Sequence, residues 1–288
     1  MKLLAVVVLY HPDGDVLANI RTYLPGVDCL LLWDNTPRDC IDRERLGALQ
    51  ALEKSIYMGK GENVGIGEAL NAAVDYARQH GFTHLVTFDQ DSRFASDDFG
   101  HYLEAVRNWG ADARAIFSTN YFIKSQQAPL YPVEDAVAEV PSAMSSGSLY
   151  PLSLFEELGG FMSDLFVWGI DCEFCWRAAR HQVPTLCFRN ILLQHDLGYQ
   201  KRRRRLLGKE VFPNEYPPAR TYYNVRNGIV LHGLYPEAIN LKAHLRYHLY
   251  KRVVFVVLYE DRKWAKLRAL WLGWLDGRRG RLGERKGL

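Results

Sequence analysis

The chain has 288 residues, of which 48% are hydrophobic and 24% are charged, and its formal net charge is +3. This length and composition are typical of a globular protein with one large domain, or one domain and an appendage, and they exclude a disordered or fibrous chain. The positive charge is concentrated after Lys201, which indicates an anionic partner such as a phosphate group or a membrane surface.

Cysteine usage and the N-terminal segment predict a cytoplasmic protein. The five cysteines include one Cys-x-x-Cys pair, Cys172 and Cys175, without the second pair of ligands that a zinc site needs. A redox dithiol is an alternative for this pair, but reduced thiols are the simplest interpretation. The apolar run at 3–9 lacks the cleavage site of a signal peptide, and no run reaches the roughly 18 to 20 apolar residues of a membrane-spanning helix.

Strands and helices are expected to alternate along residues 1–95. Short apolar runs predict buried strands at 3–9, 29–33, 55–58 and 85–88. Apolar residues at helical spacing predict helices at 16–24, 46–52 and 68–80. This alternation is typical of an α/β fold with a mostly parallel sheet, right-handed crossovers and flanking helices.

Acidic residues follow two of the predicted strands. Asp89 and Asp91 are spaced i, i+2 in an extended segment, so their side chains point the same way. The two carboxylates can converge on one cation or one sugar ring, with a positive group or a shared proton between them. Asp34 and Asn35 follow the second strand, and open α/β sheets bind ligands at the carboxyl ends of their strands. A polar loop is an equally simple interpretation of an Asp-x-Asp pattern taken alone.

A loop with two glycines, Gly65 and Gly67, precedes the third predicted helix. The loop lacks the third glycine of a dinucleotide-binding fingerprint and does not follow the first strand, so it is a weak signal for such a site. Glycines at the start of a helix still let the backbone approach a ligand closely. The loop is therefore a further candidate for a nucleotide contact.

The middle of the chain is less regular. Helices are expected at 99–109 and 155–161, and strands at 115–118 and 183–193. The small-residue loop that contains Ser146, Gly147 and Ser148 can admit a bulky ligand or be a plain turn. His195 follows the last predicted strand, where it is a candidate metal ligand.

A helix is expected to begin near Asp171, directly after the apolar segment 166–170. An acid in apolar surroundings suits a general base, although Asp at a helix start is also a common N-cap. Glu173 and Arg177 are spaced i, i+4 and can pair on one face of this helix.

The C-terminal part is basic and aromatic. The run 201–205 is expected to be a mobile loop, either a solvated basic surface or a contact to phosphates. Trp264, Trp271 and Trp274 fall at helical spacing among basic residues, which predicts a helix that lies on a membrane surface or packs on the preceding domain. The segment 277–288 is rich in Gly and Arg and is expected to be flexible.

Taken together, these motifs resemble glycosyltransferase family 2, the inverting GT-A enzymes, and most closely its bacterial rhamnosyltransferase branch. They occur in the family's order over roughly residues 3–230, and the form Phe88-Asp-Gln-Asp-Ser92 is the most specific to rhamnosyltransferases. The other motifs are residues 5–10 with His11-Pro12, Asp34-Asn35, residues 62–65, residues 145–148, Asp171-x-Glu173-x-x-x-Arg177, His195-x-x-Gly198 and Tyr222-Tyr-x-x-Arg226-Asn227.

The resemblance implies a domain organisation and a nucleotide-sugar site. A GT-A catalytic domain would span 1–230, with a nucleotide-sugar half at about 1–95 and an acceptor half at about 96–230, and basic amphipathic helices with a flexible tail would follow at 231–288. Asp34 would recognise the base and Asp89 would lie near the ribose. The implied donor-binding residues are Tyr10, Asp34, Asn35, Asn63, Gly65, Asn71, Asp89, Gln90 and Arg204.

The resemblance also implies the groups that carry the reaction. Asp91 and His195 would hold a divalent cation, Mg²⁺ or Mn²⁺, on the donor diphosphate. Asp171 would take the proton of the acceptor hydroxyl in a single inverting displacement. The implied acceptor-binding residues are Ser146, Gly147, Ser148, Trp168 and Glu173.

Two departures from the family pattern bear on the function. The usual Glu-Asp pair before the base is Ile170-Asp171 here, and the Gln-x-x-Arg-Trp motif of processive members is missing. The missing motif favours transfer of one or a few sugars. The resemblance implies that this sugar is L-rhamnose, moved from dTDP-β-L-rhamnose to a lipid-linked surface glycan. The enzyme is expected to attach peripherally to the cytoplasmic face of the membrane and to have no nucleic-acid partner.

Four alternatives stay open at this point. The donor can be another nucleotide sugar, such as a UDP-hexose. A nucleotidyltransferase would need a Gly-rich basic loop after the first strand, where residues 10–13 read Tyr-His-Pro-Asp. A glycosidase also uses two carboxylates but has no need of His195. A polyanion- or membrane-binding module would explain the basic C-terminal third but not the acids at the strand ends.

Overall fold

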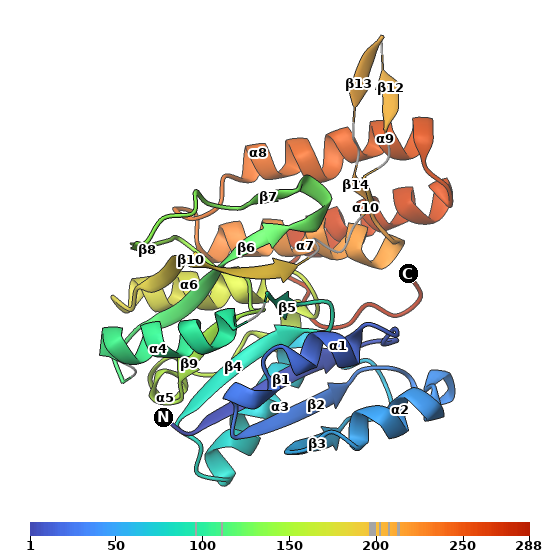
Figure 1. The fold of residues 1–288 in the computed structure, drawn as a ribbon. Helices are drawn as coiled ribbons and strands as arrows, with labels where there is room; N and C mark the ends of the chain where they lie inside the picture. The colour runs from blue at the N-terminus through green and yellow to red at the C-terminus, as the bar shows by residue number, and fades with distance from the viewer. Residues whose placement is uncertain (96, 111, 196–199, 202, 207, 212–213) are drawn as a thin grey trace. The chain divides into compact units, whose positions relative to one another are not determined.

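The computed structural model describes residues 1–95, 97–110, 112–195, 200–201, 203–206, 208–211 and 214–288. These residues form two compact units (Figure 1). The first unit comprises Met1–Phe161 and Phe174–Asp196, and the second comprises Met162–Glu173 and Leu197–Leu288.

The first unit is built on one mixed sheet with the strand order β3-β2-β1-β4-β9-β6-β10-β5. These strands are β1 (Leu3–Leu9), β2 (Cys29–Asp34), β3 (Ser55–Met58), β4 (His84–Asp89), β5 (Arg93–Phe94), β6 (Ile116–Ile123), β9 (Ser148–Pro151) and β10 (Thr185–His195). Two short strands extend the sheet, since β7 (Ala128–Pro129) pairs with β6 and β8 (Val137–Glu139) pairs with β10. The sequence-based prediction of an α/β fold is confirmed.

The parallel strands bring the predicted acids to one edge of the sheet. Strands β1 to β4 are parallel, and Leu9 at the end of β1 is the register partner of Asp34 in β2. On the other side of β1, Val8 is the partner of Asp89 in β4. The carboxyl ends of three neighbouring strands therefore meet, which is where ligands bind in open α/β sheets.

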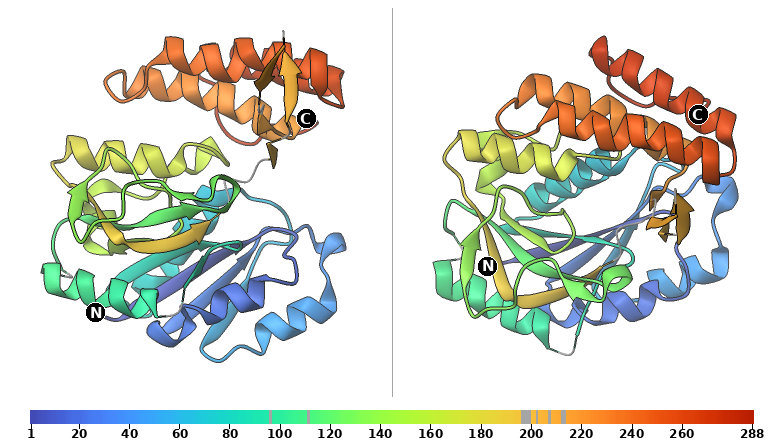
Figure 2. Two further views of the ribbon diagram at one scale, coloured as in Figure 1. Left: turned by 45° about the horizontal axis from the view of Figure 1, so that its top comes forward. Right: turned by 90° about the horizontal axis from the view of Figure 1, so that it is seen from above.

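Helices cover both faces of this sheet. Helices α1 (Val16–Arg21) and α2 (Arg43–Gln50) connect β1, β2 and β3 in one direction, and α3 (Ile66–Gln79) returns to β4 on the other side of β1. Right-handed crossovers therefore place α1 and α2 on one face and α3 on the opposite face, as Figures 1 and 2 show. The other helices of the unit are α4 (Asp98–Gly110), α5 (Ser153–Leu158) and the greater part of α6 (Ile170–Arg180).

An aromatic core lies beneath the acidic edge of the sheet. Tyr23 and Phe88 stack with their ring centroids 4.0 Å apart, and Phe94 and Phe99 pack around them. Burial, followed by the nearby carboxylates of Asp89 and Asp91, raises the pKa of the Tyr23 phenol far above its ordinary value. The stack anchors the ends of β4 and β5, from which the acidic motif projects.

The second unit is mainly helical. Its principal helices are α7 (Pro218–Leu234), α8 (Leu241–Leu245), α9 (Lys251–Tyr259) and α10 (Lys263–Arg278), with a π-helical turn, Arg246–Tyr250, that joins α8 to α9. Helix α10 packs along α7. Two short antiparallel pairs precede α7, formed by β11 (Gln200–Lys201) with β14 (Asn214–Glu215) and by β12 (Arg204–Leu206) with β13 (Lys209–Val211).

Three features of the second unit differ from the sequence-based description. Residues 204–206 form a strand rather than part of a loop, whereas position 202 of the basic run lies outside the described residues. The expected domain boundary near 230 falls inside α7. The expected flexible tail is tied to the unit, because the backbone N–H of Gly283 donates to Asp164 O at 2.8 Å. The division into a catalytic domain and an appendage stays a prediction.

Among the helices in the described part of the chain, none combines the length and the apolar character needed to cross a membrane.

Candidate active site

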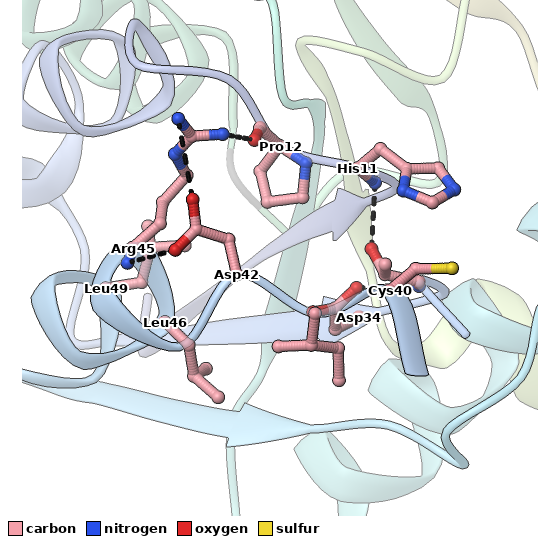
Figure 3. Close-up of a pocket in the computed structure, with 10 residues that line it drawn as sticks. His11, Pro12, Asp34, Cys40, Asp42, Arg45, Leu46 and Leu49 are labelled. Atoms are coloured by element: carbon pink, nitrogen blue, oxygen red, sulfur yellow. Dashed lines mark hydrogen bonds and ion pairs between the residues drawn. The ribbon is translucent and has the colours of Figure 1, made fainter. Parts of the chain in front are cut away.

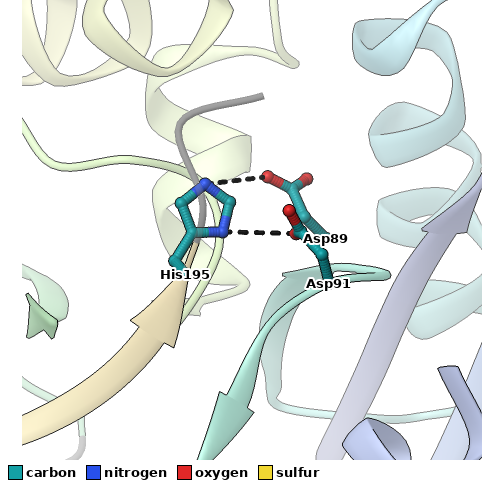
Figure 4. A group of neighbouring side chains, drawn as sticks. All are labelled: Asp89, Asp91 and His195. Atoms are coloured by element: carbon teal, nitrogen blue, oxygen red, sulfur yellow. Dashed lines mark ion pairs between the residues drawn. The ribbon is translucent and has the colours of Figure 1, made fainter. Parts of the chain in front are cut away.

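Asp89, Asp91 and His195 converge at the carboxyl edge of the sheet (Figure 4). Asp89 is the last residue of β4, Asp91 lies in the turn that follows, and His195 ends β10. Asp89 Oδ2 lies 3.8 Å from His195 Nε2, and Asp91 Oδ1 lies 3.3 Å from His195 Nδ1. The carboxylates are partly exposed while the imidazole is buried, so the group is open to a ligand on its acidic side.

The pairing of β5 with β10 explains how residues so far apart in sequence meet. Arg93 is the antiparallel partner of Gln194, so the residue before Arg93, Ser92, faces the residue after Gln194, His195. The Ser92 hydroxyl and His195 Nδ1 are 2.9 Å apart. This pairing involves two residues of β5, which is too short a strand for sequence periodicity to reveal.

A buried serine links this group to the loop before β9. The Ser146 hydroxyl donates to Ser92 Oγ at 2.7 Å and accepts from the backbone N–H of Asp89 at 3.0 Å. Both serines are fully buried. The Ser146 hydroxyl therefore fixes the end of β4, while the Ser92 hydroxyl contacts the His195 imidazole.

The donor atoms of this group suit a divalent cation. One atom each from Asp89, Asp91 and His195 lies within 4.8 Å of the others. Carboxylate oxygens suit Mg²⁺ and Mn²⁺, and an imidazole nitrogen favours Mn²⁺. Because Ser92 contacts Nδ1, the ring presents Nε2 toward Asp89, the arrangement in which a partner on one nitrogen orients the other for a metal. The sequence assigned the metal to Asp91 and His195, and the structure adds Asp89 to the cluster.

Gln90, between the two acids, fastens the turn to the loop after β1. Its side chain accepts from the backbone N–H of Tyr10 at 2.8 Å and donates to Tyr10 O at 3.2 Å. Its own carbonyl accepts from the side chain of Asn19 in α1 at 2.9 Å. Gln90 therefore holds the exposed Tyr10 beside the acidic turn.

A cleft of about 150 Å³ opens next to Tyr10, between the loop after β1 and the segment that leads into α2 (Figure 3). Asp34 lines the cleft and is buried, and its carboxylate accepts from the Thr36 N–H and from the Tyr57 hydroxyl, each at 2.7 Å. Burial and the hydrogen bond to Asp34 raise the pKa of Tyr57. The ten residues that line the cleft are His11, Pro12, Asp34, Thr36, Cys40, Ile41, Asp42, Arg45, Leu46 and Leu49.

The lining of the cleft combines polar and apolar side chains. Asp34, Thr36, Asp42 and Arg45 are polar or charged, whereas Ile41, Leu46 and Leu49 are apolar. A flat heterocycle with hydrogen-bonding edges fits this combination. Of the ten lining residues, sequence reasoning selected Asp34 as a site residue and placed His11 and Pro12 in a motif. The others come from the segment 36–49, which carries no strand-end signal.

Three other predicted donor-binding residues have structural hydrogen bonds. Asn35 is buried, donates to Gly65 O at 3.1 Å and accepts from the Trp33 indole N–H at 3.0 Å. Asn63 Oδ1 accepts from the backbone N–H of Gly65 at 3.0 Å. Gly65 has a φ of +85°, a conformation that favours glycine, at the N-cap of α3. These contacts shape the loop before α3, and a donor contact from the three residues stays a prediction.

Asn71 lies on α3 and binds the backbone of Phe161 through both ends of its side-chain amide. Its Nδ2 donates to Phe161 O at 2.9 Å, and its Oδ1 accepts from Phe161 N at 2.7 Å. This gives Asn71 a structural role that the sequence did not predict. Its expected donor contact stays a prediction.

The loop predicted to bind the acceptor is packed inside the first unit. The Ser148 hydroxyl donates to Met144 O at 2.7 Å, and the backbone N–H of Gly147 donates to Thr87 O at 2.7 Å. Gly147 has a φ of +80°, and a Cβ there would lie 2.7 Å from a Leu193 methyl group. With Ser146 also buried, these contacts support the sheet edge, and an acceptor role for the loop stays a prediction.

Asp171, Glu173 and Trp168 belong to the second unit. Asp171 lies in the first turn of α6, and its Oδ1 accepts from the Cys172 N–H at 2.9 Å. Glu173 is buried and accepts a hydrogen bond from the Tyr235 hydroxyl at 2.7 Å. The Trp168 ring lies 5.2 Å from that of His244. Their catalytic and acceptor roles stay predictions.

The loop before Asp171 is held by the motif at 222–227. The buried guanidinium of Arg226 donates to the carbonyls of Asp164 and Leu165 at 3.3 and 3.0 Å. Asn227 donates to the carbonyls of Leu165 and Trp168 at 2.9 and 2.6 Å. This is the structural use of a motif to which the sequence alone assigned no role.

Arg204, the last predicted donor-binding residue, is half-buried in β12 of the second unit. Its donor contact stays a prediction. In the motif His195-x-x-Gly198, the positions after His195 lie outside the described residues.

Comparison with known proteins identifies the fold. The crystal structure of S. aureus TarS in complex with UDP-GlcNAc is similar with a TM-score of 0.57 and 11% identity, over 93% of this chain and 79% of that one. The crystal structure of GalNAc-T7 with UDP, GalNAc and Mn²⁺ gives a TM-score of 0.54 and 10% identity, over 88% of this chain and 57% of that chain. This chain thus spans less than two thirds of the GalNAc-T7 chain.

By sequence, the chain is similar to the dTDP-rhamnosyl transferase RfbF of Shigella flexneri. The two are 24% identical over 243 residues, which cover 79% of this chain and 78% of RfbF. No protein-family model matches the chain.

The mixed sheet and the flanking helices are those of the GT-A glycosyltransferase fold, which this chain shares with both solved structures. The similarity to RfbF agrees with the resemblance of the motifs to the rhamnosyltransferase branch of glycosyltransferase family 2, and the prediction of a glycosyltransferase enzyme is confirmed.

Proposed function

We propose that the protein transfers L-rhamnose from dTDP-β-L-rhamnose to a hydroxyl group of a glycan acceptor. The observation that supports this most directly is the convergence of Asp89, Asp91 and His195 within 4.8 Å at the carboxyl edge of the sheet. The similarity to a dTDP-rhamnosyl transferase supports the choice of donor.

In this proposal the cleft lined by Asp34 receives the thymine base. The Asp34 carboxylate would accept from a base N–H, and the apolar lining residues Ile41, Leu46 and Leu49 suit the thymine methyl group. Gln90 links the acidic turn to the cleft. It lies between Asp89 and Asp91 and binds the backbone of Tyr10, whose neighbour His11 lines the cleft. The base and the diphosphate would thus be held by adjoining segments of one sheet edge.

The proposed metal-binding residues act on the diphosphate. Asp89, Asp91 and His195 would hold a Mg²⁺ or Mn²⁺ ion, which neutralises charge on the departing dTDP. Ser92 and Ser146 keep the imidazole and the end of β4 in place. Preorganised groups of this kind favour the transition state because they do not have to reorient as charge develops.

Asp171 is the proposed general base. The acceptor oxygen attacks the anomeric carbon, the bond from that carbon to the diphosphate breaks, and the acceptor proton passes to the Asp171 carboxylate. One displacement inverts the anomeric centre and requires no enzyme nucleophile. The acceptor is proposed to be a lipid-linked glycan, which would bring the protein to the inner face of the membrane as a peripheral enzyme.

The test is a thermal-shift series with dTDP, UDP and GDP, each with and without Mn²⁺ or Mg²⁺. A ligand that binds only the folded state stabilises it by about 2.7 kcal/mol at roughly 100 times its dissociation constant. Stabilisation by dTDP that requires the metal and is lost in Asp91→Asn is the expected result. Asp112→Asn, at an exposed position, is the matched control.

Two outcomes would change the proposal. A preference for UDP would keep the transferase and replace the donor with another nucleotide sugar, the kind of ligand found in the TarS complex with UDP-GlcNAc. No response to any nucleotide would contradict the proposed donor site.

The role of Asp171 as general base is tested separately. The Asp171→Asn variant should keep dTDP binding and lose transfer.

A further inference from the structure

The segment 241–259 is a helix whose composition differs from that of the rest of the molecule. Helix α8, the π-helical turn and α9 follow one another without a break. No Asp or Glu occurs between Ala238 and Tyr259, whereas the same stretch contains four basic residues: Lys242, Arg246, Lys251 and Arg252. An uninterrupted basic helix of this kind favours an anionic partner.

One face of this helix is apolar and exposed to solvent. Its residues follow the spacing i, i+3, i+4, i+7, i+8, and they are between 37% and 64% exposed. We call them the α9 stripe: Tyr250, Val253, Val254, Val257 and Leu258. Side chains at this spacing lie on one side of a helix. Scattered apolar residues on a surface are common, but a contiguous group of five marks an interaction site.

The opposite face of the helix fixes it to the second unit. Val256 and Arg252 are buried, and Arg252 forms an ion pair with the buried Glu260. Glu260 also accepts from Lys266 of α10 at 2.9 Å. Because the helix is already anchored through this face, docking the α9 stripe elsewhere in the unit would require these buried ion pairs to break.

Basic and aromatic groups border the stripe. Arg246 and Lys251 are exposed, and Lys251 Nζ lies 5.9 Å from the centre of the Tyr247 ring. Lys263 Nζ donates to Val257 O at 2.7 Å, which places the start of α10, with its 85% exposed Trp264, at the C-terminal end of the stripe. Aliphatic side chains flanked by tyrosine, tryptophan and lysine are the composition of a helix that lies in a membrane interface.

We propose that the α9 stripe inserts into the surface of an anionic membrane, with Arg246 and Lys251 on the lipid phosphates. The four basic residues of the segment prevent it from spanning the bilayer, whereas its free aliphatic face favours insertion to the depth of the headgroups. The sequence assigned this role to the tryptophans of α10, of which Trp264 and Trp271 are exposed, whereas the contiguous exposed aliphatic face lies on α9.

This inference rests on the proposed function for its purpose, which is to present a lipid-linked acceptor, but its test does not require transfer. The full-length protein is sedimented with vesicles of phosphatidylcholine alone and with vesicles of equal parts phosphatidylcholine and phosphatidylglycerol. The expected result is binding to the anionic vesicles that falls with added salt.

Two variants examine the two parts of the surface. Val254→Ser combined with Leu258→Ser should lower vesicle binding about tenfold or more, because each buried methylene contributes to insertion. Lys251→Glu should lower binding to anionic vesicles about tenfold, because it replaces an attraction by a repulsion. The matched controls are Trp109→Ser and Arg43→Glu, at exposed positions of the first unit, which should bind vesicles as the wild type does.

The outcomes separate this inference from the proposed function. Stabilisation by dTDP with Mn²⁺ should be unchanged in the stripe variants, so failure of the donor test and failure of vesicle binding are independent results. Equal binding by wild type and stripe variants would overturn the proposal. So would an absence of vesicle binding together with a dimer that Val254→Ser/Leu258→Ser dissociates, since the stripe would then contact a second copy of the chain.

Discussion

At the scale of single residues, the orientation of His195 decides what the acidic edge of the sheet can bind. Its Nδ1 is 2.9 Å from the Ser92 hydroxyl, and Ser92 is held in turn by Ser146. A partner on one ring nitrogen fixes the tautomer and directs the other nitrogen toward a metal. The two serines therefore fix the orientation of the His195 ring without being metal ligands themselves.

Replacing Ser92 by Ala should lower the affinity for Mn²⁺ by about 10- to 100-fold, the usual effect of removing a hydrogen-bond partner of a metal-bound histidine. The measurement is a titration of the protein with Mn²⁺ alone, followed by electron paramagnetic resonance. Ser118→Ala is the control, because Ser118 is also buried in the sheet but its hydroxyl donates to Leu186 O. Equal affinities in Ser92→Ala and the wild type would contradict this role.

At the scale of elements, Arg226 joins three segments of the second unit. Besides the loop before α6, it donates to the carbonyls of Arg281 and Gly283, and its guanidinium stacks 4.9 Å from the Tyr223 ring. A buried cation is stabilised only when such partners replace water. Arg226 therefore ties the C-terminal segment after α10 to α7 and to the loop before α6.

Arg226→Met should destabilise the protein by about 3 kcal/mol or more, because it removes a buried guanidinium together with the hydrogen bonds that it donates to the carbonyls of Asp164, Leu165, Arg281 and Gly283. The measurement is the free energy of unfolding in urea, and Arg279→Met, at an exposed position, should change it little. Transfer activity should also fall, because the loop leads into Asp171, while dTDP binding should persist in the folded fraction. A stability equal to that of Arg279→Met would contradict this account.

The contact between α7 and the helix at 241–259 includes two histidines. Burial, followed by repulsion from His244 and Arg252, lowers the pKa of His248 from 6.5 to about 3. Burial also lowers the pKa of His244. Between pH 6.5 and 3 the unfolded chain therefore takes up a proton at His248 that the folded chain does not, so stability is lost as the pH falls through this range.

The loss in the free energy of unfolding that is due to His248 should reach about 1 kcal/mol near pH 5.5. His248→Phe should remove that part of the pH dependence of stability. The measurement compares the free energy of unfolding at neutral pH and at about pH 5.5 in the wild type and the variant. His101→Phe, which changes an exposed histidine of α4, should leave the pH dependence as it is. An unchanged slope in His248→Phe would exclude His248 as its origin.

At the scale of the whole molecule, the chain divides its proposed tasks between two units. The group of Asp89, Asp91 and His195 and the cleft lined by Asp34 lie in the first unit. Asp171 and the α9 stripe lie in the second. The chain passes between the units within α6, so one helix carries Asp171 in its first turn and packs into the first unit with its later turns.

Binding of dTDP with Mn²⁺ should therefore protect the first unit selectively from hydrogen exchange. At roughly 100 times the dissociation constant, amides of that unit that exchange through its unfolding should slow about 100-fold. The change is followed peptide by peptide by mass spectrometry, with Asp91→Asn as the control. Protection at β12 would support a donor contact from Arg204, whereas protection confined to α7–α10 would contradict the division.

Much of the first unit was predictable because β1, β2 and β4 are buried along almost their whole length. The expected strand at 3–9 matches β1, since an apolar run between turn residues has few other uses, and the expected strand at 55–58 matches the half-buried β3. The convergence of Asp89 with Asp91 was anticipated from their spacing after a predicted strand, and that of Asp91 with His195 from the family resemblance, whereas the single group of three was not. The hairpin at 204–211 was not anticipated either, because its strands are short and lack an apolar face.

The sequence by itself determined the α/β architecture, the acids at the strand ends and the resemblance to rhamnosyltransferases, because these depend on local periodicity and on motifs contiguous in the chain. Only the tertiary structure decided that Ser92 and Ser146 orient His195, that Asn71 binds Phe161, and that the exposed apolar face belongs to α9. Hydrogen-bond partners and exposure depend on which distant segments pack together, and residue spacing along one segment does not specify that packing.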